Sequence, residues 1–308
     1  MNSNYSQHKT LVVLTGPTAV GKTELSIKLA KMLGSPIISA DSRQIYKEMQ
    51  IGTASPTPSQ LAQVEHHFVC MLALDDYYSA ARYEEDALKL IGTLLTTHDT
   101  LLMTGGSMMY IDAVCNGIDD VPTIETSTRE FLKQKLASEG ELSMLEELRL
   151  LDPAYYQTVD HRNTKRVVHA LEIYYQTGRP FSSFRTGMKK TRDFNIVKIG
   201  LNRDRSELFE RINRRVDAMI EAGLLDEARR LYPFRSLNSL NTVGYKEMFK
   251  VIDGEWDLPF AVERMKKNTR VYAKKQLTWL RKDPEITWVC LNTMSENEIF
   301  EKIFNLIG

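Results

Sequence analysis

The feature that most constrains this chain is an octapeptide near its N-terminus, Gly16-Pro-Thr-Ala-Val-Gly-Lys-Thr23, which fits the pattern G-x-x-x-x-G-K followed by Ser or Thr. The apolar run Leu11–Gly16 precedes it, and Gly21–Leu33 follows with apolar residues at helical spacing. In such a loop, backbone N–H groups and the helix N-terminus converge on phosphate oxygens. Lys22 can reach the terminal phosphate, and the Thr23 hydroxyl can ligate Mg²⁺. The motif predicts a bound diphosphate or triphosphate without deciding which.

The elements after this loop alternate between strand and helix. Ser35–Ala40 and Thr100–Gly105 read as buried strands, His66–Leu72 is a weaker strand candidate, and Arg82–Leu95 reads as a helix. Such alternation is typical of a parallel sheet with helices on both faces. The sequence therefore predicts an α/β core.

The alternation stops between residues 117 and 193, where the pattern becomes helical. We therefore expect a core made of residues 1–116 and 194–308, interrupted by a helical insertion domain over 117–193. The clearest helical segments expected in the insertion are Thr128–Ala137, Leu142–Leu150 and Thr164–Thr177. The elements expected after it are a strand at Phe194–Leu201, helices at Ser206–Leu231 and Pro259–Lys282, a strand at Ile286–Leu291 and a terminal helix.

Asp41 directly follows the second strand, in Ala40-Asp-Ser-Arg-Gln44. The carboxyl ends of the strands in an open parallel sheet face the ligand crevice, and this position suits a carboxylate that acts as a general base. Asp41 and Gln44 also have capping-box spacing, so Asp41 could instead only begin a helix. The residues alone leave both interpretations open.

Two further groups are candidates for the same crevice. Ser107 ends the strand that leads into Gly105-Gly-Ser107, where its hydroxyl could donate to a phosphate oxygen, although a plain turn is the alternative. The expected helix Glu207–Gly223 carries Arg211 and Arg215 on one face, where an inward arginine could stabilise charge on a departing phosphate; solvent-facing arginines are the alternative. A nucleotide hydrolase is expected to have a Walker-B pattern, four apolar residues followed by an acid. Leu101-Leu-Met-Thr-Gly105 lacks it and Ile37-Ile-Ser-Ala-Asp41 does not fit it cleanly, which argues against a hydrolase.

Charge is balanced overall, with 40 basic and 40 acidic residues, but it is locally segregated. His161–Arg192 carries eight Lys/Arg against one acid, and Arg264–Lys282 carries eight and no acid. Each could be a solvated helix face, yet two such stretches in a neutral protein favour a polyanionic partner. Three scattered cysteines support neither a zinc site nor a disulfide framework, and no apolar run has the length of a membrane span. We expect a cytoplasmic monomer.

Taken together, these stretches resemble the bacterial tRNA dimethylallyltransferase family, also called tRNA isopentenyltransferase. The resemblance extends from the N-terminus to near residue 281, in family order. The motifs that carry it are Gly16-Pro-Thr-Ala-Val-Gly-Lys-Thr23, Ala40-Asp-Ser-Arg-Gln-Ile-Tyr46, Ile51-Gly-Thr-Ala54, Arg162-Asn-Thr-Lys-Arg-Val-Val-His-Ala-Leu-Glu172, Gly244-Tyr-Lys-Glu247 and Thr269-Arg-Val-Tyr-Ala-Lys-Lys-Gln-Leu-Thr-Trp-Leu-Arg281.

The resemblance implies a P-loop NTPase-like core with an insertion that grips the anticodon stem. It implies Mg²⁺-dependent transfer of a dimethylallyl group from dimethylallyl diphosphate to N6 of the adenosine just 3′ of the tRNA anticodon. By the same likeness Asp41 is the base, and Ser107 with Arg211 or Arg215 holds the diphosphate. The implied diphosphate-binding residues are Gly16, Pro17, Thr18, Ala19, Val20, Gly21, Lys22 and Thr23. The implied tRNA-binding residues are Asp41, Ser42, Arg43, Gln44, Arg129, Arg162, Asn163, Thr164, Lys165, Arg166, Gly244, Tyr245 and Lys246.

One loop departs from the family pattern. Where the family usually has Gly-Gly-Thr-Gly-Leu-Tyr, this chain has Gly105-Gly-Ser-Met-Met-Tyr110, which keeps a hydroxyl but adds the bulk of two methionines. Three other functions are alternatives: a P-loop kinase acting on a nucleotide or other small molecule, a transferase that prenylates free adenine nucleotides, and an RNA-binding GTP or ATP switch. The first two need neither basic stretch, and the third lacks a base-specificity motif such as N-K-x-D.

Overall fold

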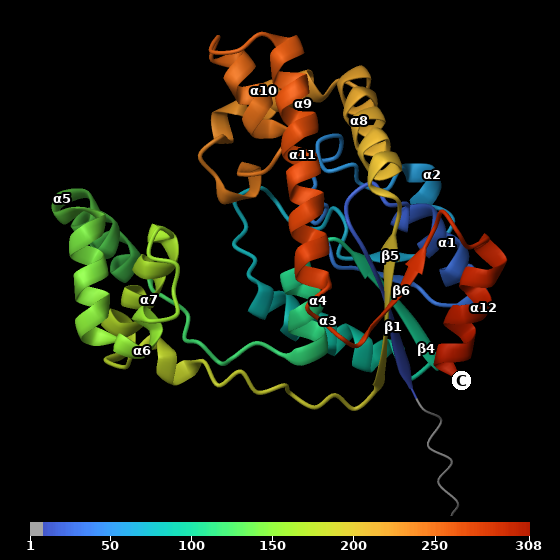
Figure 1. The fold of residues 1–308 in the computed structure, drawn as a ribbon, viewed down its shortest axis with the longest axis horizontal. Helices are drawn as coiled ribbons and strands as arrows, with labels where there is room; N and C mark the ends of the chain where they lie inside the picture. Colours follow the sequence, from blue (N-terminus) through green and yellow to red (C-terminus); the bar gives the residue numbers. More distant parts are fainter. Residues whose placement is uncertain (1–8) are drawn as a thin grey trace, which may run out of the picture. The chain divides into compact units, whose positions relative to one another are not determined.

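The computed structural model describes residues 9–308, which form two compact units (Figure 1). Unit 1 contains the chain up to Cys115 together with Arg192–Gly308, and unit 2 is Asn116–Thr191. The helical insertion expected over 117–193 thus corresponds to unit 2, which begins one residue earlier and ends two residues earlier.

Unit 1 is built on a six-stranded sheet in which every pairing is parallel, with the strand order β3-β2-β4-β1-β5-β6. The predicted α/β core is therefore confirmed. The strands are β1 (Thr10–Thr15), β2 (Ile37–Ser39), β3 (His66–His67), β4 (Thr100–Gly105), β5 (Asn195–Asn202) and β6 (Ile286–Cys290).

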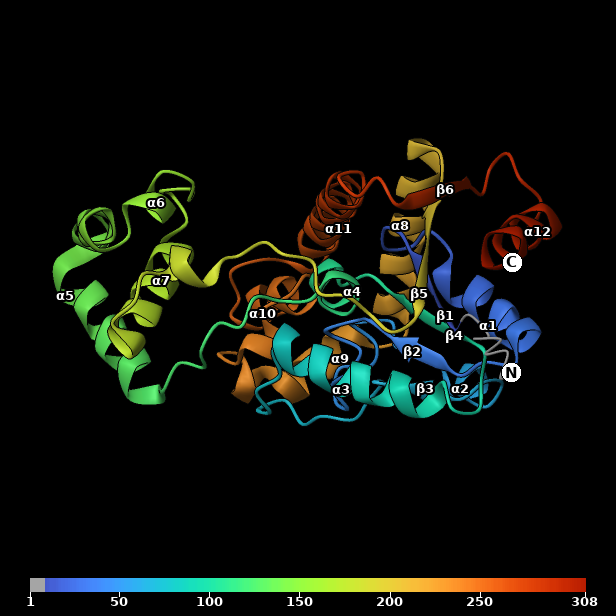
Figure 2. The ribbon, with the colours of Figure 1, turned by 90° about the horizontal axis from the view of Figure 1, so that it is seen from below.

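The central strand β1 explains why the sheet has helices on both faces. All six of its residues are buried, as expected for a strand covered on two sides. Leu11 and Val13 belong to one hydrophobic cluster, and Val12 and Leu14 belong to the other, because successive side chains of a strand point to opposite faces. Helix α3 (Ala80–Leu94) packs into the first cluster and α1 (Lys22–Leu33) into the second, on opposite sides of the sheet (Figures 1 and 2).

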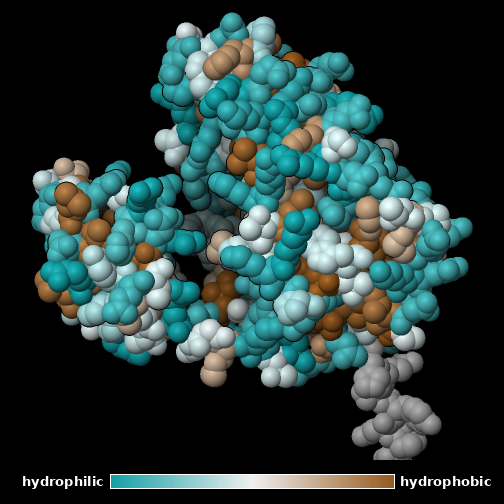
Figure 3. Space-filling view, in the orientation of Figure 1, coloured by the Kyte–Doolittle hydropathy of each residue, from teal (hydrophilic) through white to brown (hydrophobic). Residues whose placement is uncertain are grey.

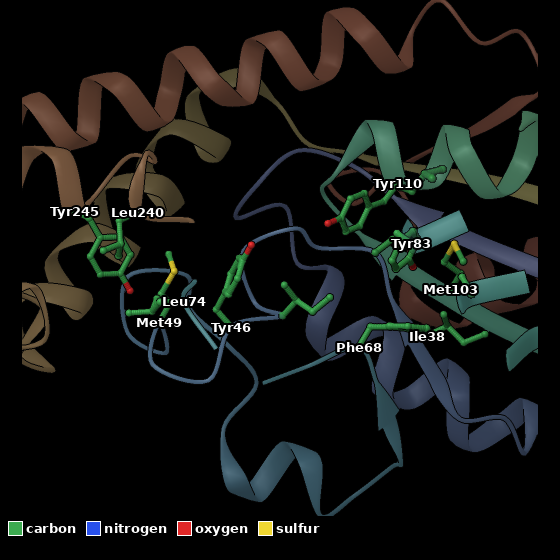
Figure 4. Close-up of a cluster of buried hydrophobic side chains, with 14 of the residues drawn as sticks. Ile38, Tyr46, Met49, Phe68, Leu74, Tyr83, Met103, Tyr110, Leu240 and Tyr245 are labelled. Carbon is green, nitrogen blue, oxygen red and sulfur yellow. The ribbon is translucent and has the colours of Figure 1, made fainter. Parts of the chain in front are cut away.

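The helices of unit 1 either cover the sheet or pack against one another beyond it (Figure 1). They are α1 (Lys22–Leu33), α2 (Pro58–Leu61), α3 (Ala80–Leu94), α4 (Met108–Asn116, whose last residue already belongs to unit 2), α8 (Arg205–Glu221), α9 (Leu224–Leu231), α10 (Tyr245–Ile252), α11 (Leu258–Leu280) and α12 (Glu296–Ile307), with short 3₁₀ turns at Tyr232–Phe234 and Asn238–Leu240. The first cluster extends from α3 and the sheet to α10, and Figure 4 shows Tyr83 and Met103 near one end of it and Tyr245 near the other.

Two predicted elements differ in the structure. The single helix expected over 206–231 is two helices, α8 and α9, because Gly223 has φ +95° and ends the helical path. The strand expected at His66–Leu72 is reduced to the two residues of β3, since Phe68 and Cys70 have positive φ and leave the strand conformation.

Unit 2 has a hydrophobic core of its own. It contains α5 (Thr126–Leu151), α6 (Pro153–Tyr156), α7 (Thr164–Thr177) and a 3₁₀ turn at Phe181–Phe184. The two helices expected within α5 are separated by a kink at Gly140, where φ is +83° and ψ is 171°. Leu132 and Leu148, from the two halves of α5, belong to one hydrophobic cluster with Leu171 of α7.

The chain enters and leaves unit 2 at neighbouring points. The backbone N–H of Lys190 donates to the carbonyl of Asn116 at 2.7 Å.

On the face shown in Figure 3, most of the surface is hydrophilic. Between residues 9 and 308, no helix has the length and hydrophobicity needed to span a bilayer.

Candidate active site

A cavity of about 560 Å³ lies where strands β1, β2 and β4 end. Its walls include Lys22 and Thr23 of the phosphate loop, Asp41, and both Arg211 and Arg215 of α8. Segments that are distant in sequence therefore meet at the carboxyl edge of the sheet, as the strand order requires. The structure brings Lys22, Thr23, Asp41, Arg211 and Arg215 together here, whereas Ser107 is not among the residues that line the cavity.

Lys22 is folded back onto the phosphate loop. Its ammonium group donates to the carbonyls of Gly16 and Pro17, both at 2.9 Å. Removal from solvent, and then the positive charge of Arg215, lower the pKa of Lys22 to about 8, while Asp41 opposes the shift. A phosphate would offer this ammonium a full negative charge in place of the two carbonyl dipoles.

Asp41 uses one carboxylate oxygen for structure and directs the other toward the cavity. Its Oδ1 accepts hydrogen bonds from the backbone N–H groups of Arg43 (2.9 Å) and Gln44 (3.2 Å). Residues 42–45 form turns and no helix starts there, so capping a helix is not its role. A Cβ placed on Gly106 would lie 3.9 Å from both Asp41 Oδ2 and Lys22 Nζ, and the two charged groups therefore face the same point.

Ser107 follows Gly106, which lines the cavity, and it is bonded to the turn after Asp41. Its Oγ accepts a hydrogen bond from the backbone N–H of Ser42 at 2.7 Å and donates to the Ser42 hydroxyl at 2.9 Å. The Ser107 backbone N–H donates to the carbonyl of Ala40 at 3.0 Å. The hydroxyl thus holds the turn after Asp41, and its contact with a phosphate stays a prediction.

Arg211 and Arg215 of α8 point inward, not to solvent. Arg211 Nε donates to the carbonyl of Ala19 in the phosphate loop at 2.9 Å. Arg215 Nη2 donates to the carbonyl of Thr53 at 3.2 Å. Burial lowers the pKa of Arg215, and the nearby Asp41 partly counteracts this. Two guanidinium groups consequently border the space beside the phosphate loop.

Two residues of the site were missed from the sequence. Gln276 of α11 is 1% exposed; its Oε1 accepts from the backbone N–H of Thr18, and its Nε2 donates to the carbonyl of Gly106, both at 2.8 Å. Arg203 Nε donates to the carbonyl of Val20 at 2.8 Å. Gln276 could have been found by helical periodicity, because it shares the buried face of α11 with Ala273. We find no comparable signal for Arg203.

Comparison with known proteins gives the family. The model of the IPP transferase family matches residues 44–283. The chain belongs to this family.

Its relatives are similar over nearly their whole length. It is 58% identical over 292 residues to tRNA dimethylallyltransferase 1 of Bacteroides thetaiotaomicron, covering 95% of this chain and 94% of the relative. It is 60% identical over 278 residues to tRNA dimethylallyltransferase 2 of Parabacteroides distasonis, covering 90% and 93%.

Two solved structures share the fold. The tRNA isopentenylpyrophosphate transferase of Bacillus halodurans has a TM-score of 0.71 at 35% identity, with 97% of each chain covered. A eukaryotic dimethylallyltransferase acting on tRNA has a TM-score of 0.81 at 25% identity, with 96% of this chain and 78% of that chain covered. The predicted P-loop NTPase-like core is therefore the fold of this IPP transferase.

Several residues expected to bind tRNA have internal partners in unit 1. Arg43 Nη1 donates to the carbonyls of Asn238 (2.9 Å) and Ser239 (2.8 Å). Gln44 Nε2 donates to the carbonyl of Ala54 at 3.0 Å. Lys246 is exposed and available to a partner, whereas Gly244 is buried.

The side chain of Tyr245, which the resemblance places among the tRNA-binding residues, lies inside the core of unit 1. Its side chain is fully buried, and its hydroxyl donates to Glu227 at 2.7 Å. An aromatic ring enclosed in the core cannot contact RNA without unpacking. The structure therefore gives Tyr245 a role in holding the fold.

The expected tRNA residues of unit 2 lie in α5 and around the start of α7. Arg162, Lys165 and Arg166 are exposed, and the Asn163 side chain caps α7 by accepting from the N–H of Arg166 at 3.3 Å. Thr164 is the first residue of α7, and Arg129 is half-buried on α5. The exposed cations around the cap are free to meet phosphates of a bound RNA.

Proposed function

We propose that this IPP transferase moves a dimethylallyl group from dimethylallyl diphosphate to N6 of the adenosine 3′-adjacent to the anticodon in tRNA. The observation that carries the proposal is the convergence of a phosphate loop, two arginines and the Asp41 carboxylate on one cavity. Close relatives with the name tRNA dimethylallyltransferase support it. Because tRNA is the acceptor, we place the enzyme in the cytoplasm, and we expect it to act as a monomer.

The phosphate loop and the arginines would bind the donor's diphosphate. Breaking the allylic C–O bond leaves negative charge on the diphosphate, and fixed positive groups stabilise that charge most where water is excluded. Lys22, Arg211 and Arg215 supply three such groups around the cavity. They would make the diphosphate a good leaving group by neutralising its charge as the C–O bond breaks.

The donor set of the cavity fits a magnesium ion brought in with the diphosphate. Mg²⁺ in phosphate-transfer sites takes few protein ligands and keeps waters and phosphate oxygens. Thr23 lines the cavity, and between residues 9 and 308 no group of three acidic, His or Cys side chains competes as an all-protein metal cage. Held by Thr23, Mg²⁺ would neutralise charge on the diphosphate oxygens.

Asp41 would act on the acceptor. The exocyclic amine of adenine is a weak nucleophile because its lone pair is delocalised into the ring. As the N6–C bond forms and the C–O bond breaks, one amine proton must leave, and a carboxylate that accepts it contributes about 10²–10⁴ in rate. A second cavity of about 110 Å³ shares Asp41, Thr18, Arg215 and Tyr272 with the first. Asp41 therefore borders both spaces, as a base between donor and acceptor should.

The basic surfaces would hold the RNA. A target adenine must leave its stack to reach a carboxylate at the floor of a cavity, so the RNA has to be gripped on both sides of it. The exposed Lys/Arg of Arg264–Lys282 and the exposed cations near the start of α7 suit this task, mainly through phosphate contacts. A kinase for small molecules would need neither surface.

The test is direct. Incubate the protein with Mg²⁺, labelled dimethylallyl diphosphate and unmodified tRNA, then digest the RNA and separate the nucleosides. Label in an N6-prenylated adenosine next to the anticodon supports the proposal. Label only in free adenine nucleotides, or turnover only when ATP is supplied, would refute it in favour of an adenylate prenyltransferase or a kinase.

A further inference from the structure

The side chain of Glu227, in helix α9, is buried and lines neither of the two cavities described above. It is 3% exposed, and its carboxylate accepts four hydrogen bonds. Oε2 accepts from the backbone N–H groups of Gln50 (3.2 Å) and Ile51 (2.9 Å). Oε1 accepts from the N–H of Gly52 (2.9 Å) and from the Tyr245 hydroxyl (2.7 Å). Three consecutive amides thus converge on one anion, as they do in backbone nests, but the anion belongs to the protein itself.

The ring of Tyr245 packs against the same loop at Gly52. A Cβ on Gly52 would lie 2.6 Å from Cζ of Tyr245, so the backbone rests directly on the ring and only glycine fits. Burial and the nearby Glu227 carboxylate both raise the pKa of Tyr245, which keeps its hydroxyl protonated and donating. Figure 4 shows Tyr245 close to Met49, the residue that precedes the loop.

The opposite side of this loop forms part of the active site. The carbonyl of Thr53 accepts from Arg215 Nη2 and from Gln44 Nε2, both at 3.2 Å, and the carbonyl of Ala54 accepts from Gln44 Nε2 at 3.0 Å. Gly52 and Thr53 line the smaller cavity, and Ala54 lines the larger one. The backbone N–H groups of the loop therefore donate to Glu227, and the carbonyls of the same loop accept from Arg215 and Gln44.

We propose that Glu227 is a positioning residue for the transfer reaction: through the loop Gln50–Ala54 it fixes the carbonyl that aims Arg215 at the leaving diphosphate. Tyr245 completes the same anchor. The inference rests on the proposed function above. Neither residue lines the space where bonds form and break, so both act through the loop and the Thr53 carbonyl that Arg215 binds.

Glu227→Gln is the sharpest variant because it preserves size and replaces one acceptor oxygen with a donor that faces N–H groups. We expect kcat to fall about tenfold to a hundredfold, as small misplacements of catalytic groups do, with tRNA affinity unchanged. The matched control is Glu84→Gln. Glu84 is another buried carboxylate of unit 1, paired with Arg192 at 2.8 Å and outside both cavities, and its variant should retain wild-type kcat.

A double-mutant cycle separates positioning from a general loss of structure. If Glu227 acts through Arg215, adding Glu227→Gln to Arg215→Ala should lower kcat by less than about twofold. Multiplicative losses in the double variant, or a wild-type kcat in folded Glu227→Gln, would overturn the proposal.

Circular dichroism and thermal unfolding report whether each variant folds. If Glu227→Gln does not fold, Tyr245→Phe decides, because it keeps the ring under Gly52 and removes one of the four donors. A kcat lowered about threefold at unchanged tRNA affinity supports the anchor, and a wild-type kcat overturns it. Absence of transfer by the wild-type protein in the same assay would instead refute the proposed function.

Discussion

Gln276 accepts a hydrogen bond of 2.8 Å from the backbone N–H of Thr18, and this bond ties the phosphate loop to helix α11. The nitrogen of the same side chain donates at 2.8 Å to the carbonyl of Gly106, next to Ser107. A primary amide carries a donor and an acceptor on one carbon, so it satisfies both partners at once. The side chain thus joins the phosphate loop to the β4–α4 turn at the larger cavity, which Thr18, Gly106 and Gln276 all line.

Gln276→Glu should destabilise the protein and weaken donor binding. The substitution preserves shape but places a carboxylate oxygen against the Gly106 carbonyl. Two buried acceptors then face each other without a donor, which should lower the free energy of unfolding by about 1–3 kcal/mol. Denaturant unfolding should show this loss, and the KM for dimethylallyl diphosphate should rise. Gln63→Glu is the control, since Gln63 is exposed and already accepts from Lys31 at 2.8 Å. Equal stability of the two variants would contradict the interpretation.

Asp41→Asn should lower turnover by about 10²–10⁴ while largely sparing diphosphate binding. Asparagine retains an Oδ1 that can accept from the N–H groups of Arg43 and Gln44, so the turn should persist and only the base should be removed. Single-turnover kinetics and diphosphate titration measure the two quantities separately. The control is Asp257→Asn, because Asp257 caps α11 through an equivalent bond to Phe260 N–H and lies outside both cavities. Near-normal turnover of Asp41→Asn would remove Asp41 from the role of base.

Diphosphate affinity should fall as pH rises above about 8, where Lys22 loses its proton. The unfolded chain holds that proton up to the ordinary lysine pKa of 10.5, so between these values the unliganded protein should become more stable with pH. Diphosphate binding has the opposite pH dependence, because it needs the protonated lysine. Its association constant should fall by up to about tenfold per pH unit.

Lys22→Arg isolates this effect, because arginine stays charged and the diphosphate's own titration is common to both proteins. Calorimetric titrations from about pH 7 to about pH 9.5, which bracket the lowered lysine pKa, should give a steeper decline for the wild type than for the variant. Parallel profiles would show that Lys22 does not titrate in this range.

Neutralising Arg162, Lys165 and Arg166 together should weaken tRNA binding at low salt and flatten its salt dependence. Removing one cation that neutralises a phosphate reduces the slope of log affinity against log salt by about 0.7–0.9, so the triple alanine variant should have a slope smaller by about two. Turnover at saturating tRNA should be retained. Lys28→Ala, an exposed lysine of α1 paired with Glu296, is the control. An unchanged slope in filter-binding assays would argue that this surface does not contact the RNA.

The sheet and the phosphate site could be predicted because their signals are local. A glycine-rich loop between an apolar run and an amphipathic segment specifies both neighbours, and Asp41 follows from its place at a strand end. The break between α8 and α9 is also local, since Gly223 is visible in the sequence, but the apolar spacing continues across it and suggests one helix.

The anchor around Glu227 could not be predicted in the same way. Tyr245 stands between Gly244 and the exposed Lys246, which suggests a surface motif, whereas its burial depends on Gly52, far away in the sequence. Glu227 lies between residues of a charged helix, and only the fold reveals that three loop amides face it. Such groups are defined by long-range packing, for which a single sequence carries no periodic signal.

The hydrogen bond between Lys190 and Asn116 holds the first residues of unit 2 beside its last residues. A segment attached in this way can grow, shrink or be exchanged over evolutionary time without a change in the spacing of β4 and β5, since the two ends remain pinned side by side. The part of the molecule expected to grip the RNA can therefore vary independently of the part expected to perform the chemistry.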